Sequence, residues 1–379
     1  MDFTYDDEQT ALRDAVRALT TKAYGQFENR RKVAADAPGF DEDFWGKLAE
    51  MGVLGLPFSE DDGGVGAGPT EIGLVAQELG RVLAPEPFLS SVVHAGGLVA
   101  AAGSSEQRSD LLGRLAAGDL VLAAAQAPPG GRWSTEAAGV RAAEDGDGWT
   151  LTGVHDPVPH GARADYLVVS AALPDGGTGL FLVEGESSTR TDYAMFDGGR
   201  AAHVEFDKTA AVPLGEPGRD LTRTIATISD ITRIMGANQA LGVMQAQVAA
   251  TTDYLKSRKQ FGVTLNTFQA LAFRAADMYV SLELTHSMVE WATMVIGSGS
   301  QEDIADAADR VGLQVTRAGR HIGQESIQLH GGIAMTAEYS VGVGTAHLVA
   351  LEQWLGGAQH HLTRLADRVT RHGEVEALA

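Results

Sequence analysis

Two short motifs, Arg258-Lys-Gln-Phe-Gly262 running on to Phe268-Gln269, and Gln328-Leu-His-Gly-Gly332, interrupt long helical patterns in the last third of the chain. A long apolar-periodic stretch leads up to the first motif, and apolar residues recur at helical spacing through residues 271–296 and 304–322. Such stretches predict long antiparallel helices that pack on their apolar faces as a bundle. The two motifs are therefore expected at the ends of packed helices.

Each motif places a side chain able to hold a ligand beside glycine. Arginine suits bidentate contact with a phosphate, so Arg258 is a candidate phosphate ligand, and Phe261 offers a surface for stacking a base. The Gln328 amide can donate and accept hydrogen bonds at once, and Gly331-Gly332 lets a ligand approach the backbone. Taken singly, the arginine could be a charge at a helix C-terminus and the glycine pair a helix stop. Their joint occurrence predicts a bound dinucleotide.

The rest of the chain predicts two further domains, so that the fold is mainly α with a central β domain. Residues 1–120 are predicted to form an N-terminal helical domain, in which segment 61–69 is a turn because it lacks the Lys-Ser/Thr of a P-loop. Residues 121–215 predict a small β barrel or sandwich, and residues 216–379 the C-terminal helical bundle. The β-prone runs are 149–152, 166–169, 180–183 and 204–206.

Composition narrows the class of protein. Lys and Arg number 29 against 50 Asp and Glu, a net charge of −21, which argues against a nucleic-acid-binding surface. There is no cysteine, so neither disulfides nor thiol chemistry are expected, and no metal-ligand spacing is present. The acidic start lacks the apolar core of a signal peptide, and no run of roughly 18 apolar residues predicts a membrane span. We expect a cytoplasmic protein.

Over essentially its whole length the chain resembles an acyl-CoA dehydrogenase. The two motifs carry the resemblance, supported by Gly52-Val-Leu-Gly-Leu-Pro57 and Val204-Glu-Phe-Asp207. The resemblance implies a helical domain, a β domain and a four-helix bundle. It also implies that the motifs bind the adenosine diphosphate half of an FAD that lies mainly on a neighbouring subunit. The residues given this role are Arg258, Gln260, Phe261, Phe268, Gln269, Gln328, Gly331 and Gly332.

The catalytic base of the family is missing at both of its known positions. In the family reaction a Glu carboxylate removes the α-proton of an acyl-CoA thioester, and a hydride leaves the β-carbon for the flavin. Most members carry this Glu in a Tyr-Glu-Gly string, which here reads Trp354-Leu355-Gly356, and others in a Glu-Arg pair, which here reads Thr232-Arg233. Leucine has no basic atom, and a threonine hydroxyl is far too weak a base near neutral pH. We therefore predict that this chain has no catalytic Glu.

Two acids lie close in sequence to the vacant positions. Glu352 lies one helical turn before Leu355, and Asp230 lies two residues before Thr232. We interpret both as surface acids, with a relocated catalytic base as the alternative.

The β domain departs from the family as well. Where members usually carry Thr-Glu-Pro-x-x-Gly-Ser, this chain reads Gln126-Ala-Pro-Pro-Gly-Gly131-Arg132. The usual Trp-Ile-Thr segment beside the flavin ring is replaced by Pro157-Val-Pro159, and proline donates no backbone N–H. His155 and His160 lie nearby, and we interpret them as surface loop histidines.

These departures form a pattern. Residues that would serve an FAD in the chain's own β domain are altered, whereas those that would serve an FAD across a subunit interface are intact. The pattern predicts one subunit of a heterotetrameric FAD-dependent acyl-CoA dehydrogenase, paired with a catalytic sister subunit. The resemblance further implies a bulky acyl-CoA, such as a steroid-derived one, as substrate and electron-transfer flavoprotein as acceptor. Two alternatives stay open: a homomeric acyl-CoA dehydrogenase with a relocated base, and a non-redox acyl-CoA-binding or structural relative.

Overall fold

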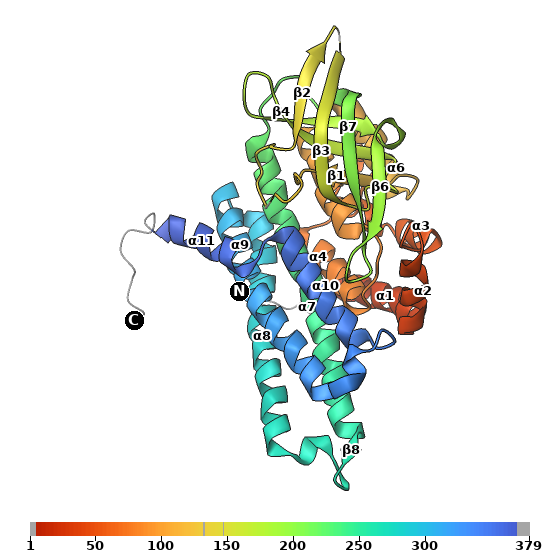
Figure 1. The fold of residues 1–379 in the computed structure, drawn as a ribbon, viewed down its shortest axis with the longest axis vertical. Coiled ribbons are helices and arrows are strands. Elements are labelled where there is room, and N and C mark those ends of the chain that lie inside the picture. The colour runs from red at the N-terminus through yellow and green to blue at the C-terminus, as the bar shows by residue number, and fades with distance from the viewer. Residues whose placement is uncertain (1–4, 132, 147, 370–379) are drawn as a thin grey trace.

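The N-terminal part of the protein, seen in a computed structural model, is helical (Figure 1). The structure describes residues 5–131, 133–146 and 148–369. Asp6 and Asp41 cap the first turns of α1 and α3, and Pro69 opens α4. The elements are α1 (Asp7–Tyr24), α2 (Phe27–Ala35), α3 (Glu42–Glu50), the 3-10 turns η1 (Val53–Gly55) and η2 (Glu60–Asp62), α4 (Pro69–Arg81), the π-helix η3 (Phe88–Gly96), α5 (Gly97–Ala102) and α6 (Ser105–Ala116).

The glycine-rich segment after η2 is a turn, as predicted. A Cβ atom on Gly64 would lie 2.3 Å from the carbonyl oxygen of Phe58, so close packing of backbone on backbone requires glycine there.

The middle of the chain is a closed barrel. Strand β4 pairs with β1, β2 and β5, and the path β4-β2-β3-β7-β5 returns to β4, while β6 lies beside β7. The sequence left open whether this domain is a barrel or a sandwich, and the closed path of strands shows that it is a barrel. The four predicted β-prone runs all lie in strands. The strands are β1 (Leu122–Ala125), β2 (Val140–Asp145), β3 (Gly148–Pro159), β4 (Tyr166–Ala172), β5 (Thr178–Glu184), β6 (Thr189–Ala194) and β7 (Arg200–Pro213), with the 3-10 turn η4 (Gly185–Ser187) before β6.

The C-terminal part is the predicted bundle. Its helices are α7 (Thr222–Ser257), α8 (Gln269–Ser298), α9 (Gln301–His330), α10 (Ser340–Leu355) and α11 (Ala358–Arg368). The predicted stripes face the core, as Met278 and Val289 on α8 and Val311 and Ile322 on α9 are fully buried. The opposite face of α8 is also apolar: Phe273, Val280 and Leu284 are 60%, 55% and 61% exposed. A helix that is apolar on both sides is typical of one covered by a partner.

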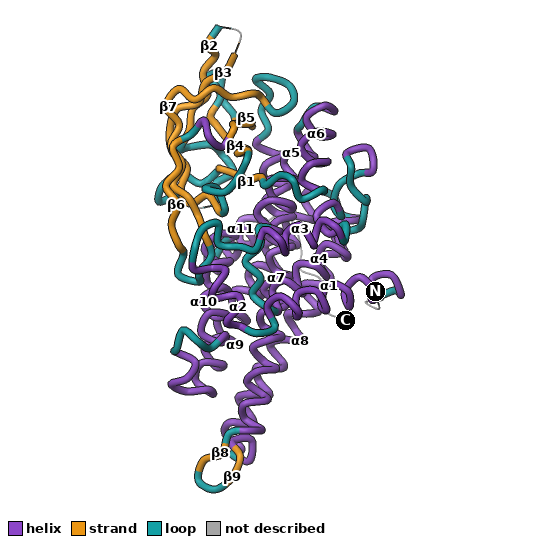
Figure 2. Tube along the Cα trace, turned by 90° about the vertical axis from the view of Figure 1, so that its right-hand side faces the viewer, coloured by secondary structure: helices purple, strands orange, loops and turns teal. Residues whose placement is uncertain are grey.

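The bundle brings both motifs to one end of the molecule. Because α7, α8 and α9 alternate in direction, the α7–α8 connection and the end of α9 point the same way, away from the barrel (Figure 2). The α7–α8 connection is a hairpin of β8 (Lys259–Gln260) and β9 (Val263–Thr264) followed by η5 (Leu265–Thr267). The second motif passes into the 3-10 helix η6 (Gly331–Met335). Within the described residues, no helix is both long and apolar enough to cross a membrane.

Candidate active site and cofactor-binding motifs

A cavity of about 410 Å³ separates the barrel from the bundle. Four segments that the sequence predicts to depart from the acyl-CoA dehydrogenase pattern meet in its wall, although they lie far apart in sequence. They are the loop 126–131 after β1, the end of β3 with Pro157 and Pro159, Thr232 on α7 and Leu355 at the end of α10. Arg132, the last residue of the altered loop, lies outside the described residues. The structure thus assembles the altered positions into one site.

Leu355 is fixed by both its backbone and its side chain. The Arg233 Nε donates a 2.7 Å hydrogen bond to the Leu355 carbonyl oxygen. The side chain lies over Gly236 of α7, where a Cβ atom would come within 2.0 Å of Leu355 Cδ1. The position is therefore a packing contact between α10 and α7.

Thr232 is committed to its own helix. Its hydroxyl donates a 2.8 Å hydrogen bond to the Ile228 carbonyl oxygen one turn earlier. The residue is 1% exposed. With the hydroxyl proton directed at the backbone, Thr232 has no role as a base, in agreement with its weak basicity.

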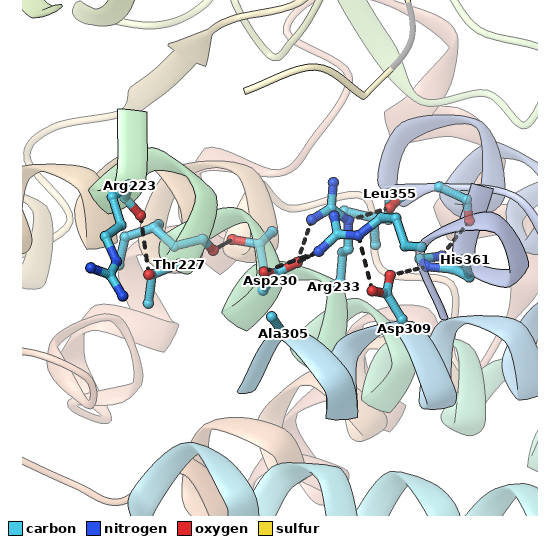
Figure 3. Close-up of polar contacts among 12 residues, drawn as sticks. Arg223, Thr227, Asp230, Arg233, Ala305, Asp309, Leu355 and His361 are labelled. Atoms are coloured by element: carbon cyan, nitrogen blue, oxygen red, sulfur yellow. Dashed lines mark hydrogen bonds and ion pairs between the residues drawn. The ribbon is translucent and has the colours of Figure 1, made fainter. Parts of the chain in front are cut away.

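Asp230 is not a surface acid, contrary to the expectation. It is 3% exposed and pairs with Arg233 at 2.6 Å and with Arg364 of α11 at 3.2 Å (Figure 3). Burial raises the pKa of Asp230, against the lowering effect of the two guanidinium groups. The carboxylate neutralises Arg233, which in turn holds the end of α10.

Glu352 is not a surface acid either. It is 8% exposed and forms a bidentate pair with Arg320 of α9, with contacts of 3.0 and 2.6 Å. Neither Glu352 nor Asp230 lines the cavity. Both acids are structural ion-pair partners, so neither is placed to act as a relocated base.

The two histidines beside the altered strand are not surface loop residues. His155 lies in β3, is fully buried, and has its Nδ1 3.1 Å from the Ala127 carbonyl oxygen and its Nε2 2.9 Å from that of Ser170. His160 is half-buried, with its Nδ1 2.8 Å from Ser90 Oγ and its Nε2 3.2 Å from the Pro85 carbonyl oxygen. Burial lowers the pKa of both, and that of His160 to about 4.

One cluster has metal-ligand types that the sequence spacing did not reveal: Asp309, His360 and His361, whose ligand atoms lie within 4.8 Å of one another. Its Asp309 carboxylate already pairs with Arg364 at 2.9 Å and with Arg368 at 2.8 Å. Two guanidinium groups at one carboxylate supply the positive charge that a cation would bring. The cluster is an ion-pair network that joins α11 to α9.

The cavity wall also contains residues that were not predicted as site residues, among them His94 from η3, Trp133, Trp354, and Asp156 from β3. Asp156 is the one carboxylate among the described lining residues. Its Oδ1 accepts a 2.6 Å hydrogen bond from Tyr193, and its Oδ2 lies 3.1 Å from His203 Nδ1. No sequence signal marks these residues, because each reaches the cavity only through the packing of the three parts.

The predicted cofactor motifs lie at the other end of the bundle and are open to solvent. Phe261 at the hairpin turn is 92% exposed, and its ring meets that of Phe268 edge to face at a centroid distance of 6.2 Å. The remaining predicted residues that are exposed are Arg258, Gln260, Gln269, Gln328, Gly331 and Gly332. Gly331 has φ +67° and ψ −147°, a conformation reserved for glycine, whereas Gly332 has no such requirement.

A buried histidine ties the two motifs to one framework. His330 stacks on Tyr254 of α7 at a ring-centroid distance of 4.5 Å and on Tyr339 at 5.2 Å. Tyr254 lies one turn before Arg258, and His330 immediately precedes Gly331. The exposed motifs are therefore held on a rigid base.

Comparison with known proteins agrees with this architecture. The family model of the acyl-CoA dehydrogenase N-terminal domain matches residues 6–119, and that of the C-terminal domain matches residues 222–370. The chain is 30% identical over 380 residues to acyl-CoA dehydrogenase FadE27 of Mycobacterium tuberculosis, covering 96% of this chain and 98% of the relative. A variant of the Tcur3481–Tcur3483 steroid ACAD has TM-score 0.86 at 30% identity, covering 97% and 98% of the two chains. The ChsE4–ChsE5 complex from Mycobacterium tuberculosis has TM-score 0.88 at 27% identity, covering 100% of both.

An N-terminal helical domain, a central barrel and a C-terminal helical domain form the acyl-CoA dehydrogenase fold, which these relatives share. The chain belongs to the acyl-CoA dehydrogenase family. Members of this family bind FAD.

Proposed function

We propose that this chain is the base-lacking subunit of a heteromeric acyl-CoA dehydrogenase. In this complex it presents an adenosine diphosphate site to the FAD of a catalytic sister subunit. One observation carries the proposal: the altered positions Thr232, Leu355 and the two barrel segments converge on one cavity, while the cofactor motifs at the far end are intact and exposed. Independent drift would scatter such changes, whereas loss of one function at one site concentrates them.

The residues present fit the two halves of FAD unequally. At the exposed end, Cβ atoms on Gly262, Gly331 and Gly332 would meet nothing within 4 Å, so a ligand can approach the backbone there. In the cavity, the barrel presents Pro157 and Pro159, which have no N–H to donate to a flavin ring. We assign the adenosine side of the site to Arg258, Gln260, Phe261, Phe268, Gln269, Gln328, Gly331 and Gly332.

Within the complex, bound FAD supplies the hydride acceptor, and the sister subunit supplies the base. This chain's own residues would bind and orient the cofactor: Arg258 would contact a phosphate, Phe261 would offer a stacking surface to the purine, and Gln328 would hydrogen-bond the purine or the pyrophosphate. The exposed apolar face of α8 supports association with a partner, because a patch of this kind on an isolated chain is unfavourable in water. We expect a heterotetramer in the cytoplasm with electron-transfer flavoprotein as the acceptor.

A cavity without its own flavin leaves room for a large acyl group. One similar structure supports this choice of substrate, since it is named a steroid ACAD, and another, a complex of two differently named chains, supports a heteromeric assembly. We propose a bulky, polycyclic acyl-CoA as the substrate of the complex. An ordinary straight-chain fatty acyl-CoA that proved to be the best substrate would contradict this part of the proposal.

The alternative of a homomeric enzyme now has one specific candidate base, Asp156, because it is the carboxylate in the described cavity wall. The test is co-purification with a Glu-bearing sister chain, followed by counting FAD. We expect one FAD per pair of chains and unchanged turnover in Asp156→Asn. Two FAD per pair, or loss of turnover in Asp156→Asn, would favour the homomeric alternative. No FAD even with the partner would favour a non-redox relative.

A further inference from the structure

Two side chains in the cavity wall, from different parts of the chain, each carry a buried nitrogen without a hydrogen-bond partner among the described residues, and the Gln126 side chain also acts on the His94 imidazole. His94 in η3 is 7% exposed, and its Nε2 has no hydrogen-bond partner among the described residues. The Nε2 of Gln126, at the end of β1, is also buried and without a partner there. Neither side chain takes part in the ion pairs that hold α10 and α11 in place. Buried polar atoms of this kind are rare in folded proteins and indicate a missing ligand or water.

The packing of η3 on β1 holds the two groups together. Ser91 Oγ accepts a 2.9 Å hydrogen bond from the Leu122 N–H, which fixes the register of η3 against the strand. His94 lies one turn after Ser91, and Gln126 lies just beyond the strand, so both reach the same wall of the cavity. The His94 ring also lies 6.0 Å from that of Trp354, which forms an apolar surface beside them. A π-helix such as η3 is itself uncommon and occurs mostly at functional sites.

The chemistry of the pair selects the kind of ligand. Burial lowers the pKa of His94 to about 4, so the imidazole is neutral near pH 7 and its Nε2 can donate or accept according to tautomer. The Gln126 amide nitrogen donates. A hydroxyl or carbonyl oxygen satisfies both groups, whereas a hydrocarbon surface satisfies neither.

We propose that His94 and Gln126 form a specificity site that recognises an oxygen substituent, a hydroxyl or ketone, on the acyl group bound in this cavity. The inference rests on the proposed function, because it assigns the cavity to the acyl group and not to a flavin. The surrounding Trp354 and Leu355 contact the hydrocarbon skeleton, and the two polar groups fix its position.

The test is equilibrium binding of two matched CoA thioesters to the complex of this chain with its sister subunit. Tryptophan fluorescence measures the binding. The probes are choloyl-CoA, whose rings bear hydroxyl groups, and cholanoyl-CoA, the same skeleton without them. We expect the wild-type complex to prefer choloyl-CoA by roughly tenfold or more, because a site built to hydrogen-bond a substituent rejects the analogue lacking it. His94→Phe keeps the ring beside Trp354 and should reduce the preference to about twofold or less.

Further variants keep the test decisive. Gln126→Leu should lower the preference independently of His94, even if one of the two variants folds poorly. His94→Gln restores an amide and should retain most of the preference. His321→Phe, at an exposed position on α9, should leave it unchanged.

Three outcomes overturn the inference: equal binding of both probes by the wild type, an undiminished preference in His94→Phe, or a loss of FAD in His94→Phe. A loss of FAD in His94→Phe would show that His94 and Gln126 face a flavin. The number of FAD molecules bound by the wild-type complex distinguishes failure of this inference from failure of the proposed function. Two FAD per pair of chains would contradict the heteromeric proposal and, with it, the assignment of this cavity to the acyl group, whereas one FAD per pair with equal binding of both probes would contradict the inference alone.

Discussion

The two ends of the bundle use polar residues in opposite ways. At the cavity end, Arg233, Asp230 and Glu352 are buried and paired within the chain, and their pairs hold α10 and α11 in place. At the motif end, Arg258 and Gln328 are exposed and ready for a ligand. Charges buried in the fold determine its stability, whereas charges presented at the surface determine what the protein binds. Substitutions of these residues are therefore expected to change the unfolding free energy strongly at the cavity end and weakly at the motif end.

The largest effect is expected from Arg233→Met. The change leaves Asp230 buried with only its longer contact to Arg364, and it removes the donor to the Leu355 carbonyl oxygen. Losing one partner of a buried ion pair typically costs about 3–5 kcal/mol of unfolding free energy. Urea denaturation of the purified protein measures the loss.

The matched control is Arg31→Met, which removes an exposed pair with Glu28. It should cost no more than about 0.5 kcal/mol. If both variants were equally stable, the buried network would not be what holds the cavity end together.

A pH-dependent effect comes next, at Glu86. This residue is 5% exposed, accepts a hydrogen bond from Tyr24, and has its pKa raised by burial to about 7 from an ordinary value of 4.5. The folded state therefore keeps a proton that the unfolded state releases, so this stabilisation is complete below about pH 4.5 and is lost as the pH rises through 7.

Glu86→Gln should remove this dependence. The difference in stability between wild type and variant should change by at most about 1.4 kcal/mol per pH unit between pH 5 and 7. Thermal unfolding across this range measures it, and Arg258→Gln should follow the wild-type curve. Parallel curves for wild type and Glu86→Gln would mean that Glu86 is ionised in the folded protein.

Two adjacent glycines at the motif end, Gly331 and Gly332, differ in backbone conformation. Gly331→Ala forces a side chain into a conformation reserved for glycine and should cost about 1–3 kcal/mol. Gly332→Ala meets neither strain nor a neighbour within 4 Å and should leave thermal stability unchanged. If Gly332→Ala nevertheless lowers the FAD content of the complex, a ligand lies against that backbone. Unchanged FAD content would remove Gly332 from the site.

The smallest effect on stability is expected from Arg258→Gln, because the side chain is exposed. The unfolding free energy should change by less than about 0.5 kcal/mol. FAD affinity of the complex should nevertheless fall roughly tenfold or more, since a charge-assisted contact to phosphate is lost. Flavin absorbance after gel filtration measures the retained FAD. A variant that retains FAD fully would show that the motif does not bind the phosphate.

Much of the fold could be predicted from local patterns. The spacing of Met278, Val289, Val311 and Ile322 predicted the bundle helices and their inner faces, because a helix repeats its faces along the chain. The four short β-prone runs predicted the β domain, although not its closure. Closure depends on the pairing of β2 with β4 and of β4 with β5, which no local signal specifies.

The candidate site was predicted only in part. The motif register predicted that Thr232 and Leu355 stand where the family carries its base, but the burial of Asp230, Glu352 and His155 could not be predicted. Each of these residues is polar, and the sequence favours exposure for a polar residue. Their partners, Arg364, Arg320 and the carbonyl groups of Ala127 and Ser170, lie on separate elements.

By itself the sequence determined the helical periodicity and the two glycine-bearing motifs, since these depend on residue identity and short spacing, and it predicted the absence of the catalytic carboxylate. Only the tertiary structure brought the loop after β1, the end of β3, Thr232 and Leu355 into one cavity and left the buried Nε2 atoms of His94 and Gln126 in its wall without a hydrogen-bond partner among the described residues. The physical reason is that a cavity and its unpaired groups arise from contacts between distant segments, and their geometry is fixed by packing.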